Sequence, residues 1–383
     1  MEEGKSVVSD QMTSKARILA AFRREIPDRV PVVTFGINLL NRQDWVNHDP
    51  SFRRVTAAAA ANTDIFYRYN VDTGFCGSEP RAVGFRQEVK RDGSSRFIRN
   101  WIETGRGTLT ALTRIDDGVA TSWKLEPYVK TEDDAEALLS LPDEPCALEL
   151  SDYRRAMGEV GERGVMHITF IDALMVVLGF TTFEFGAILA VTCPDLFTQL
   201  LDMFHARMYR AYHTLLDAGV GPVVVRYGGC EYATVPLMHP RYFRGYVVRY
   251  DKPICDLIKS YPDCYVQLHC HGKMRDVIDG IMEIGPHAVE PIEPPPQGDI
   301  PLAEFKAGYG HQVCLVGNIE MVEMDRCTPE EMDARCREAI ETAGPGGGFI
   351  LTQTAPPITG LTPQMEANYL AFIEAGRKYG RYP

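Results

Sequence analysis

The stretch that decides the fold is Tyr265-Val266-Gln267-Leu268-His269-Cys270-His271-Gly272, a short β-prone run between two predicted helices. Side chains alternate between the faces of a strand, so His269 and His271 point the same way, with Gln267 behind them. Two imidazoles on one face at a strand end are typical of half of a metal or acid–base site. A lone histidine on an apolar strand is more often a hydrogen-bonded core residue, so the fold around the pair decides between these interpretations.

Short strands alternate with helices on both sides of this run. The predicted strands cover residues 29–33, 165–170, 221–227, 265–271, 287–293, 313–318 and 349–354. This alternation is typical of parallel βαβ units, and one or two further strands in residues 60–75 bring the number close to eight. We therefore predict an α/β fold, a single (β/α)8 TIM-type barrel. No GxGxxG motif follows an early strand, which disfavours dinucleotide binding.

Three further segments complete the predicted organisation. Residues 1–12 have the composition of a disordered tail, and the barrel unit then covers residues 13–383, beginning with a capped helix at Thr13 as an N-terminal helical extension. Residues 79–130 contain glycine-bounded β-prone segments, which predict a β-rich insertion or flap of hairpins. Thr131 then caps a helix with acidic residues in its first turn.

Composition excludes several classes of function. The formal net charge is −12 and the pI is about 5.3, whereas a nucleic-acid binder normally has a basic face. No run of about 18 apolar residues is present to span a bilayer, and the acidic N-terminus lacks the order of a signal peptide. The 10 cysteines are scattered without a CxxC pair, which suits free thiols in a reducing compartment. We expect a cytoplasmic protein without nucleic-acid or membrane partners.

Residues at the carboxyl ends of the predicted strands give the candidate site, because barrel active sites gather there. Zinc takes three or four N, O or S ligands, and His269 and His271 with Glu231 or Glu293 would satisfy that requirement. The remaining carboxylate could orient a histidine or accept a proton. For each carboxylate an alternative stays open: Glu231 caps a helix or pairs with an arginine, and Glu293 anchors a loop.

Roles follow for the other rim residues. We predict Glu231, His269 and Asn318 as catalytic residues, and we predict that the substrate contacts Tyr227, Arg226 and Phe35. The aromatic residues among them could equally be core packing. Cofactor-binding residues beyond the zinc ligands are not predicted.

Several motifs resemble the uroporphyrinogen decarboxylase-like superfamily, and more closely its cobalamin-dependent methyltransferase branch. The resemblance covers nearly the whole chain, and its marks are residues 13–22 leading to 27–32, 107–110 with 121–123, 268–272, 315–319, and 366–369 with 379–383. It implies a single TIM-type barrel. In that branch zinc is bound by a His-x-Cys-Gly strand and a later cysteine.

This chain departs from both branches of the resemblance. His271 stands where the methyltransferases have the first cysteine, and the last strand, residues 349–357, has no cysteine. The missing metal ligand must therefore be a carboxylate, Glu231 or Glu293. True decarboxylases hold their polyanionic porphyrinogen with an arginine-containing loop after the first strand. Here residues 34–40 contain no arginine, which disfavours porphyrinogen decarboxylation.

The resemblance and these departures lead to one functional hypothesis. Histidine and carboxylate ligands leave zinc more Lewis-acidic than thiolates do, which suits a methoxy oxygen or methylamine nitrogen. We expect a zinc-dependent methyltransferase, the demethylase component that moves a methyl group from a small methylated substrate to Co(I) of a corrinoid. The corrinoid-binding motif is absent, so cobalamin should arrive on a partner protein, and a homodimer is possible.

Two rival interpretations remain. The first is a metal-independent decarboxylase or lyase of a small carboxylated substrate, with His269 and His271 as proton donors and Arg226 holding the acid. The second is a corrinoid- or tetrapyrrole-binding accessory protein without turnover. Metal content separates the two enzymes, and cofactor binding without turnover identifies the binder.

Overall fold

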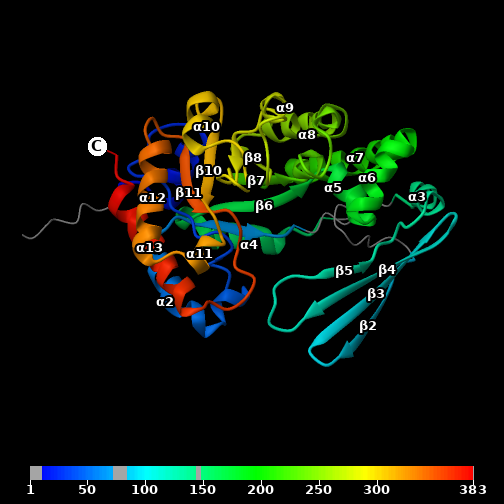
Figure 1. Cartoon of the computed structure of the whole chain (residues 1–383), viewed down its shortest axis with the longest axis horizontal. Coiled ribbons are helices and arrows are strands. Elements are labelled where there is room, and N and C mark those ends of the chain that lie inside the picture. The colour runs from blue at the N-terminus through cyan, green and yellow to red at the C-terminus, as the bar shows by residue number, and fades with distance from the viewer. Residues whose placement is uncertain (1–10, 72–83, 144–147, 383) are drawn as a thin grey trace, which may run out of the picture.

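The computed structural model describes residues 11–71, 84–143 and 148–382 (Figure 1). Its centre is a 7-stranded parallel sheet with the strand order β1-β6-β7-β8-β9-β10-β11. The strands are β1 (Phe66–Tyr69), β6 (Val165–Ile171), β7 (Val223–Gly228), β8 (Cys264–His269), β9 (Ala288–Glu290), β10 (Cys314–Ile319) and β11 (Phe349–Gln353). Helices cover the outside of this curled sheet.

The segment around Val32 closes the sheet into a ring. On one side it pairs in parallel with β11, where the Val33 N–H donates to the Leu351 carbonyl over 2.9 Å. On the other side the Asp64 N–H donates to the Val32 carbonyl over 2.7 Å, just before β1 begins. Added to the seven parallel strands, this segment completes the predicted TIM-type barrel. The fold prediction is confirmed.

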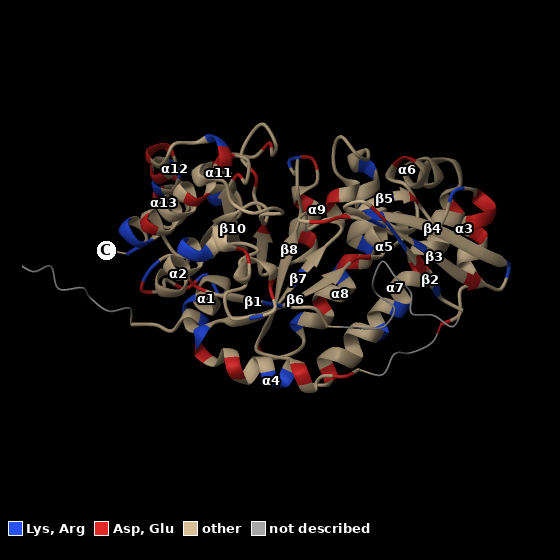
Figure 2. Ribbon diagram, turned by 90° about the horizontal axis from the view of Figure 1, so that it is seen from below, with Lys and Arg blue, Asp and Glu red and all other residues tan. Residues whose placement is uncertain are grey.

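The described helices connect these strands, with side-chain caps at Thr13 and Thr131 where the sequence indicated them. They are α1 (Ser14–Phe22), α2 (Arg53–Asn62), α3 (Glu132–Leu139), α4 (Ser151–Val160), α5 (Ala173–Phe180), α6 (Phe183–Thr192), α7 (Pro194–Asp217), α8 (Arg249–Lys259), α9 (Ile278–Ile284), α10 (Leu302–Tyr309), α11 (Glu323–Arg326), α12 (Pro329–Ala343) and α13 (Pro363–Tyr379). Thr13 caps α1, and Thr131 forms a capping box with Asp134 at the start of α3. Acidic and basic residues are interspersed along α4 (Figure 2). Among the described helices, none is both long and apolar enough to cross a membrane.

The amino-terminal end of the barrel is filled by apolar side chains. Ile18 and Phe22 of α1 cluster with inward-facing strand residues such as Val33, Val224 and Ile350. Burial of such side chains contributes about 1.5–3 kcal/mol each. This packing closes one end of the barrel, and polar side chains occupy the interior toward the other end, where the strands finish.

The predicted β-rich insertion is an antiparallel sheet with the order β2-β3-β4-β5. Its strands are β2 (Arg86–Asp92), β3 (Ser95–Thr104), β4 (Gly107–Asp116) and β5 (Trp123–Glu126), and the sheet lies beside the barrel near α3 (Figure 1). Residues 79–83 of the predicted range fall outside the described residues, as does most of the tail predicted for residues 1–12. Gln11 and Met12 are described, and their N–H groups donate to Asp28. The exact boundaries of these segments stay a prediction.

Candidate active site

The two histidines lie together at the carboxyl end of β8. His269 is its last residue, opposite Gly228 of β7 and Glu290 of β9 in the strand register. The rings of His269 and His271 are perpendicular, with their centroids 4.4 Å apart. The His269 side chain is 9% exposed and that of His271 is 38% exposed. One ring therefore lies inside the barrel and the other at its rim.

His269 belongs to a buried polar cluster centred on Glu290. Glu290 Oε2 accepts hydrogen bonds from Arg226 Nε at 3.0 Å and Gln267 Nε2 at 3.2 Å, and His269 Nδ1 lies 3.0 Å from the same oxygen. Burial opposes ionisation of Glu290, but the charge of Arg226 and the contacts with His269 and Gln267 outweigh it and hold the Glu290 pKa well below its ordinary value. An ionised Glu290 fixes the orientation of the His269 ring through Nδ1.

A second carboxylate holds His271 in the same way. Glu293 Oε1 lies 2.6 Å from His271 Nδ1, and Glu293 Oε2 accepts the Gly272 N–H at 2.6 Å. Burial tends to lower the His271 pKa, yet the hydrogen bond to Glu293 and the surrounding carboxylates raise it above its ordinary value. With both Nδ1 atoms engaged, Nε2 of each ring has no hydrogen-bond partner among the described residues.

Glu320 adds a carboxyl group that titrates near neutrality. It follows β10, and the Thr354 hydroxyl donates to its Oε2 over 3.1 Å. Burial, followed by the charge of Glu293, raises the pKa of Glu320 to about 7.

A pH dependence of stability follows from Glu320. A carboxyl with a raised folded-state pKa binds its proton more tightly in the folded than in the unfolded protein. Its contribution is therefore fully present below the unfolded pKa, about 4.3 for glutamate, and is lost as the pH rises through about 7. We expect Glu320→Gln to remove this decline, measured as the free energy of unfolding in urea between pH 4.5 and 7.5. An equal decline in Glu320→Gln and the wild type would contradict the assignment.

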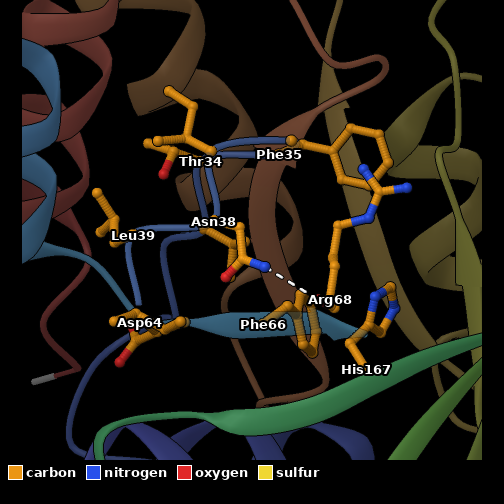
Figure 3. A pocket seen from close by; sticks show the side chains of 12 residues that line it. Thr34, Phe35, Asn38, Leu39, Asp64, Phe66, Arg68 and His167 are labelled. Carbon is orange, nitrogen blue, oxygen red and sulfur yellow. Dashed lines mark hydrogen bonds between the residues drawn. The ribbon is translucent and has the colours of Figure 1, made fainter. Parts of the chain in front are cut away.

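Phe35 lies in the loop after the first barrel strand, between two arginines. The Arg68 Cζ is 5.2 Å from the centroid of its ring, and the Arg226 Cζ is 5.7 Å from it. Figure 3 shows the Arg68 guanidinium at this ring, and His167 near the base of the Arg68 side chain, on the neighbouring strand. Gln353 at the end of β11 anchors the loop, because its Oε1 accepts the Phe35 N–H at 2.9 Å. Two of the predicted substrate residues, Phe35 and Arg226, thus lie together inside the barrel.

The other predicted residues make contacts of their own. Tyr227 is 1% exposed and donates its hydroxyl proton to Asp251 Oδ1 of α8 over 3.1 Å, in the layer outside the barrel. Glu231 accepts the Gly229 N–H at 2.9 Å, so it anchors its own loop. Asn318 is opposite Thr352 near the end of β10. The structure brings Tyr227 together with Asp251 and not with the histidines.

The polar residues that the sequence analysis did not assign are Glu290, Arg68, His167 and Glu320. Arg68 and His167 are register partners on β1 and β6, and both are polar residues on the interior face of strands that are otherwise largely apolar. A polar residue at an inward-facing position of an otherwise apolar strand was the sequence signal that could have identified Arg68 and His167.

The fit to zinc can be judged from the donor atoms. Among the described residues, no group of three or more His, Cys, Asp and Glu side chains is arranged to hold a metal ion. Glu231 and Glu293, the predicted carboxylate ligands, each have an oxygen bound to a backbone N–H. In this arrangement the side chains do not form a zinc site. The zinc site stays a prediction, and no chemical step below depends on it.

Comparisons with known proteins show which family the chain belongs to. A search of curated protein sequences finds no significant match. A methyltransferase from Methanosarcina mazei has a similar structure, with a TM-score of 0.60 and 17% identity over 96% of this chain and 99% of the other; it shows the fold. A B12-independent methionine synthase from Shewanella sp. W3-18-1, with a TM-score of 0.44, 10% identity and 73% coverage of each chain, is too distant to carry an argument. The family model "Uroporphyrinogen decarboxylase (URO-D)" matches residues 150–379, more than half of the chain. The protein therefore belongs to the uroporphyrinogen decarboxylase (URO-D) family.

Proposed function

We propose that this protein is a methyltransferase that moves a methyl group from a small methoxylated or methylated-amine substrate to Co(I) of a corrinoid on a partner protein. The observation that carries the proposal is the pair of carboxylate-held imidazoles at the open end of the barrel, His269 with Glu290 and His271 with Glu293. An imidazole fixed through Nδ1 presents Nε2 for proton transfer in a defined orientation.

The proposed reaction breaks the bond between the methyl carbon and the oxygen or nitrogen of the donor. The bonding electron pair stays on the oxygen or nitrogen, and Co(I) supplies the pair for its new bond to the methyl carbon. His271, whose protonated form is stabilised by Glu293, supplies the proton that neutralises the leaving oxygen or nitrogen. His269 lies too deep to be the principal donor and positions the substrate beside it.

The test is methyl transfer to chemically reduced free cobalamin, followed by the absorbance of methylcobalamin. Methoxyacetate, 4-methoxybenzoate and dimethylamine serve as donors, and the metal content of the protein is measured in parallel. We expect transfer from at least one donor above the rate without protein. No transfer from any donor, with reduced cobalamin present throughout, would overturn the proposal.

A decarboxylase is the second candidate, favoured by the position of Arg226. Its guanidinium lies inside the barrel on the same carboxylate as His269, where it could hold a substrate carboxylate beside a proton donor. This reaction would release CO2 and place a proton on the resulting carbanion. Release of CO2 from oxaloacetate above its spontaneous rate, without any methyl transfer, would favour this candidate over methyl transfer.

A further inference from the structure

The inner face of β6 borders open space near the end of the strand. Val165 belongs to the inward-facing cluster of the barrel, and the two-residue period of a strand turns Thr169 and Ile171 to the same side. Thr169 is exposed although its neighbours Ile168 and Phe170 are buried, and Ile171 is half-buried. An exposed side chain on the inner face of a barrel strand means that side chains do not fill the interior there. This space lies at the same end of the barrel as the two histidines.

Ile171 also lines a cavity of about 610 Å³, as bounded by the described residues. This volume falls within the range of small-molecule sites, about 300–1,000 Å³. The cavity lies where α5 and α6 meet the insertion sheet (Figure 1), and its other apolar walls are Met175, Val176, Leu178, Phe183 and Tyr232. The Phe183 and Tyr232 rings are stacked, with centroids 6.1 Å apart and planes 27° apart. Such walls favour a ligand whose body is apolar and aromatic.

A glycine separates this cavity from the first histidine. Ile171, Gly228 and His269 are register partners on β6, β7 and β8, so they face the interior at one level. A Cβ at Gly228 would lie 3.5 Å from His269 Cδ2, so the glycine keeps a space free that a side chain would occupy. Two strand spacings, about 10 Å, separate the backbones at Ile171 and His269. A methoxy group attached to one six-membered ring spans such a distance.

Neighbouring contacts hold the cavity wall beside the site. Tyr232 directly follows Glu231 in the turn Cys230–Ala233, and the charge of Glu231 is among those that raise the His271 pKa. On the opposite side Lys124 of β5 lines the cavity and donates to the Thr181 carbonyl over 3.0 Å, beyond the end of α5. The aromatic wall is therefore continuous with the loop that carries Glu231, next to the histidines.

We propose that the methyl donor is an aryl methyl ether whose ring occupies this cavity. The ring contacts Ile171, Phe183 and Tyr232. The methoxy group extends past Gly228 toward His271. This inference rests on the proposed methyl transfer and narrows its substrate to one class.

An aryl ether also suits the proposed chemistry. The bond between the methyl carbon and the phenolic oxygen breaks, and its electron pair stays on the oxygen. The oxygen takes the proton of His271 and leaves as a phenol, while Co(I) supplies the pair for its bond to the methyl carbon. A phenolic oxygen leaves more readily than an alkyl one, because the ring delocalises its negative charge.

The first test measures binding by isothermal titration, without cobalamin. The ligands are methoxybenzene, its saturated counterpart methoxycyclohexane, and the small ether 2-methoxyethanol. We expect methoxybenzene to bind about 10- to 100-fold more tightly than 2-methoxyethanol, because its ring buries more apolar surface. It should also bind more tightly than methoxycyclohexane, because the wall is aromatic. Phe183→Ala should remove this preference for the aromatic ring.

Phe185→Ala is the matched control for Phe183→Ala. Phe185 is also a half-buried residue of α6, two positions further on, and is not among the residues that line the cavity. It should bind all three ligands as the wild type does, and thermal unfolding shows whether each variant is folded. Equal affinity of the wild type for methoxybenzene and methoxycyclohexane, or equal effects of the two substitutions, would overturn the inference.

Gly228→Val tests the route from the ring to the histidines. Its two methyl groups would occupy the space beside His269, so methyl transfer from methoxybenzene to reduced cobalamin should fall about 10- to 100-fold while ring binding is kept. Unchanged transfer in Gly228→Val would contradict the inference. Transfer from 2-methoxyethanol but not from methoxybenzene would overturn it and leave the proposed function in place. Ring binding that depends on Phe183, without methyl transfer from any donor, would instead contradict the proposed function and uphold the aromatic site.

Discussion

His271→Gln is expected to lower kcat for methyl transfer by about 10²- to 10⁴-fold, the usual contribution of a positioned general acid. Glutamine keeps a hydrogen-bond donor for Glu293, so the loop ending at Gly272 should stay in place. It cannot carry the transferable proton. The measurement is the initial rate of methylcobalamin formation at saturating donor, with KM determined for both proteins.

The matched control for this substitution is His213→Gln. His213 also pairs with a carboxylate, since its Nδ1 lies 3.0 Å from Asp217 Oδ2, but the pair is exposed on α7. Its removal should leave kcat unchanged. If His271→Gln retains wild-type kcat, or if both variants lose activity equally, His271 is not the proton donor.

Glu290→Leu is expected to reduce the free energy of unfolding by about 3–5 kcal/mol, because removing one partner of a buried ion pair leaves the other uncompensated. The Arg226 side chain is 13% exposed and that of Glu290 is 0% exposed, so water cannot replace the carboxylate effectively. Urea denaturation at neutral pH measures the change, with the m-value checked for equality between the proteins.

An exposed ion pair provides the comparison for Glu290. Glu304 binds Arg275 with Oε1 2.5 Å from Nη1, and both side chains are about half exposed, at 50% and 48%. Because surface pairs are screened by water, Glu304→Leu should leave the free energy of unfolding nearly unchanged. Similar losses in both variants would mean that the Glu290 cluster contributes no more than a surface contact.

The barrel could be predicted because its signal is repeated along the chain. Strands and helices alternate over most of the sequence, and each repeat supports the same architecture. The pairing of His269 with His271 followed from the two-residue period of a strand, which geometry fixes. The same period separates Arg226 from Tyr227, so these neighbours could not both face the substrate. Arg226 faces the barrel interior, and Tyr227 binds Asp251 outside it.

Other parts of the site could not be predicted because the residue pattern does not determine where a short strand begins and ends. The prediction extended one strand to Glu293, whereas β9 ends at Glu290, ahead of Pro291, which has no N–H for a ladder. Glu290 was therefore overlooked. Arg68 was missed because β1, Phe66–Tyr69, is short and was only placed within residues 60–75. Which oxygens of Glu231 and Glu293 are occupied by backbone N–H groups depends on loop shape, which the residue pattern does not determine.

The closure of the ring at Val32 has a consequence for synthesis of the chain. The loop after that first segment contacts β11, with Phe35 and Gln353 separated by 318 positions. Contacts so distant form only after most of the polypeptide has left the ribosome, and such non-local pairing slows folding. Until β11 emerges, the segment around Val32 lacks its final neighbour, and the nascent barrel stays open along one seam.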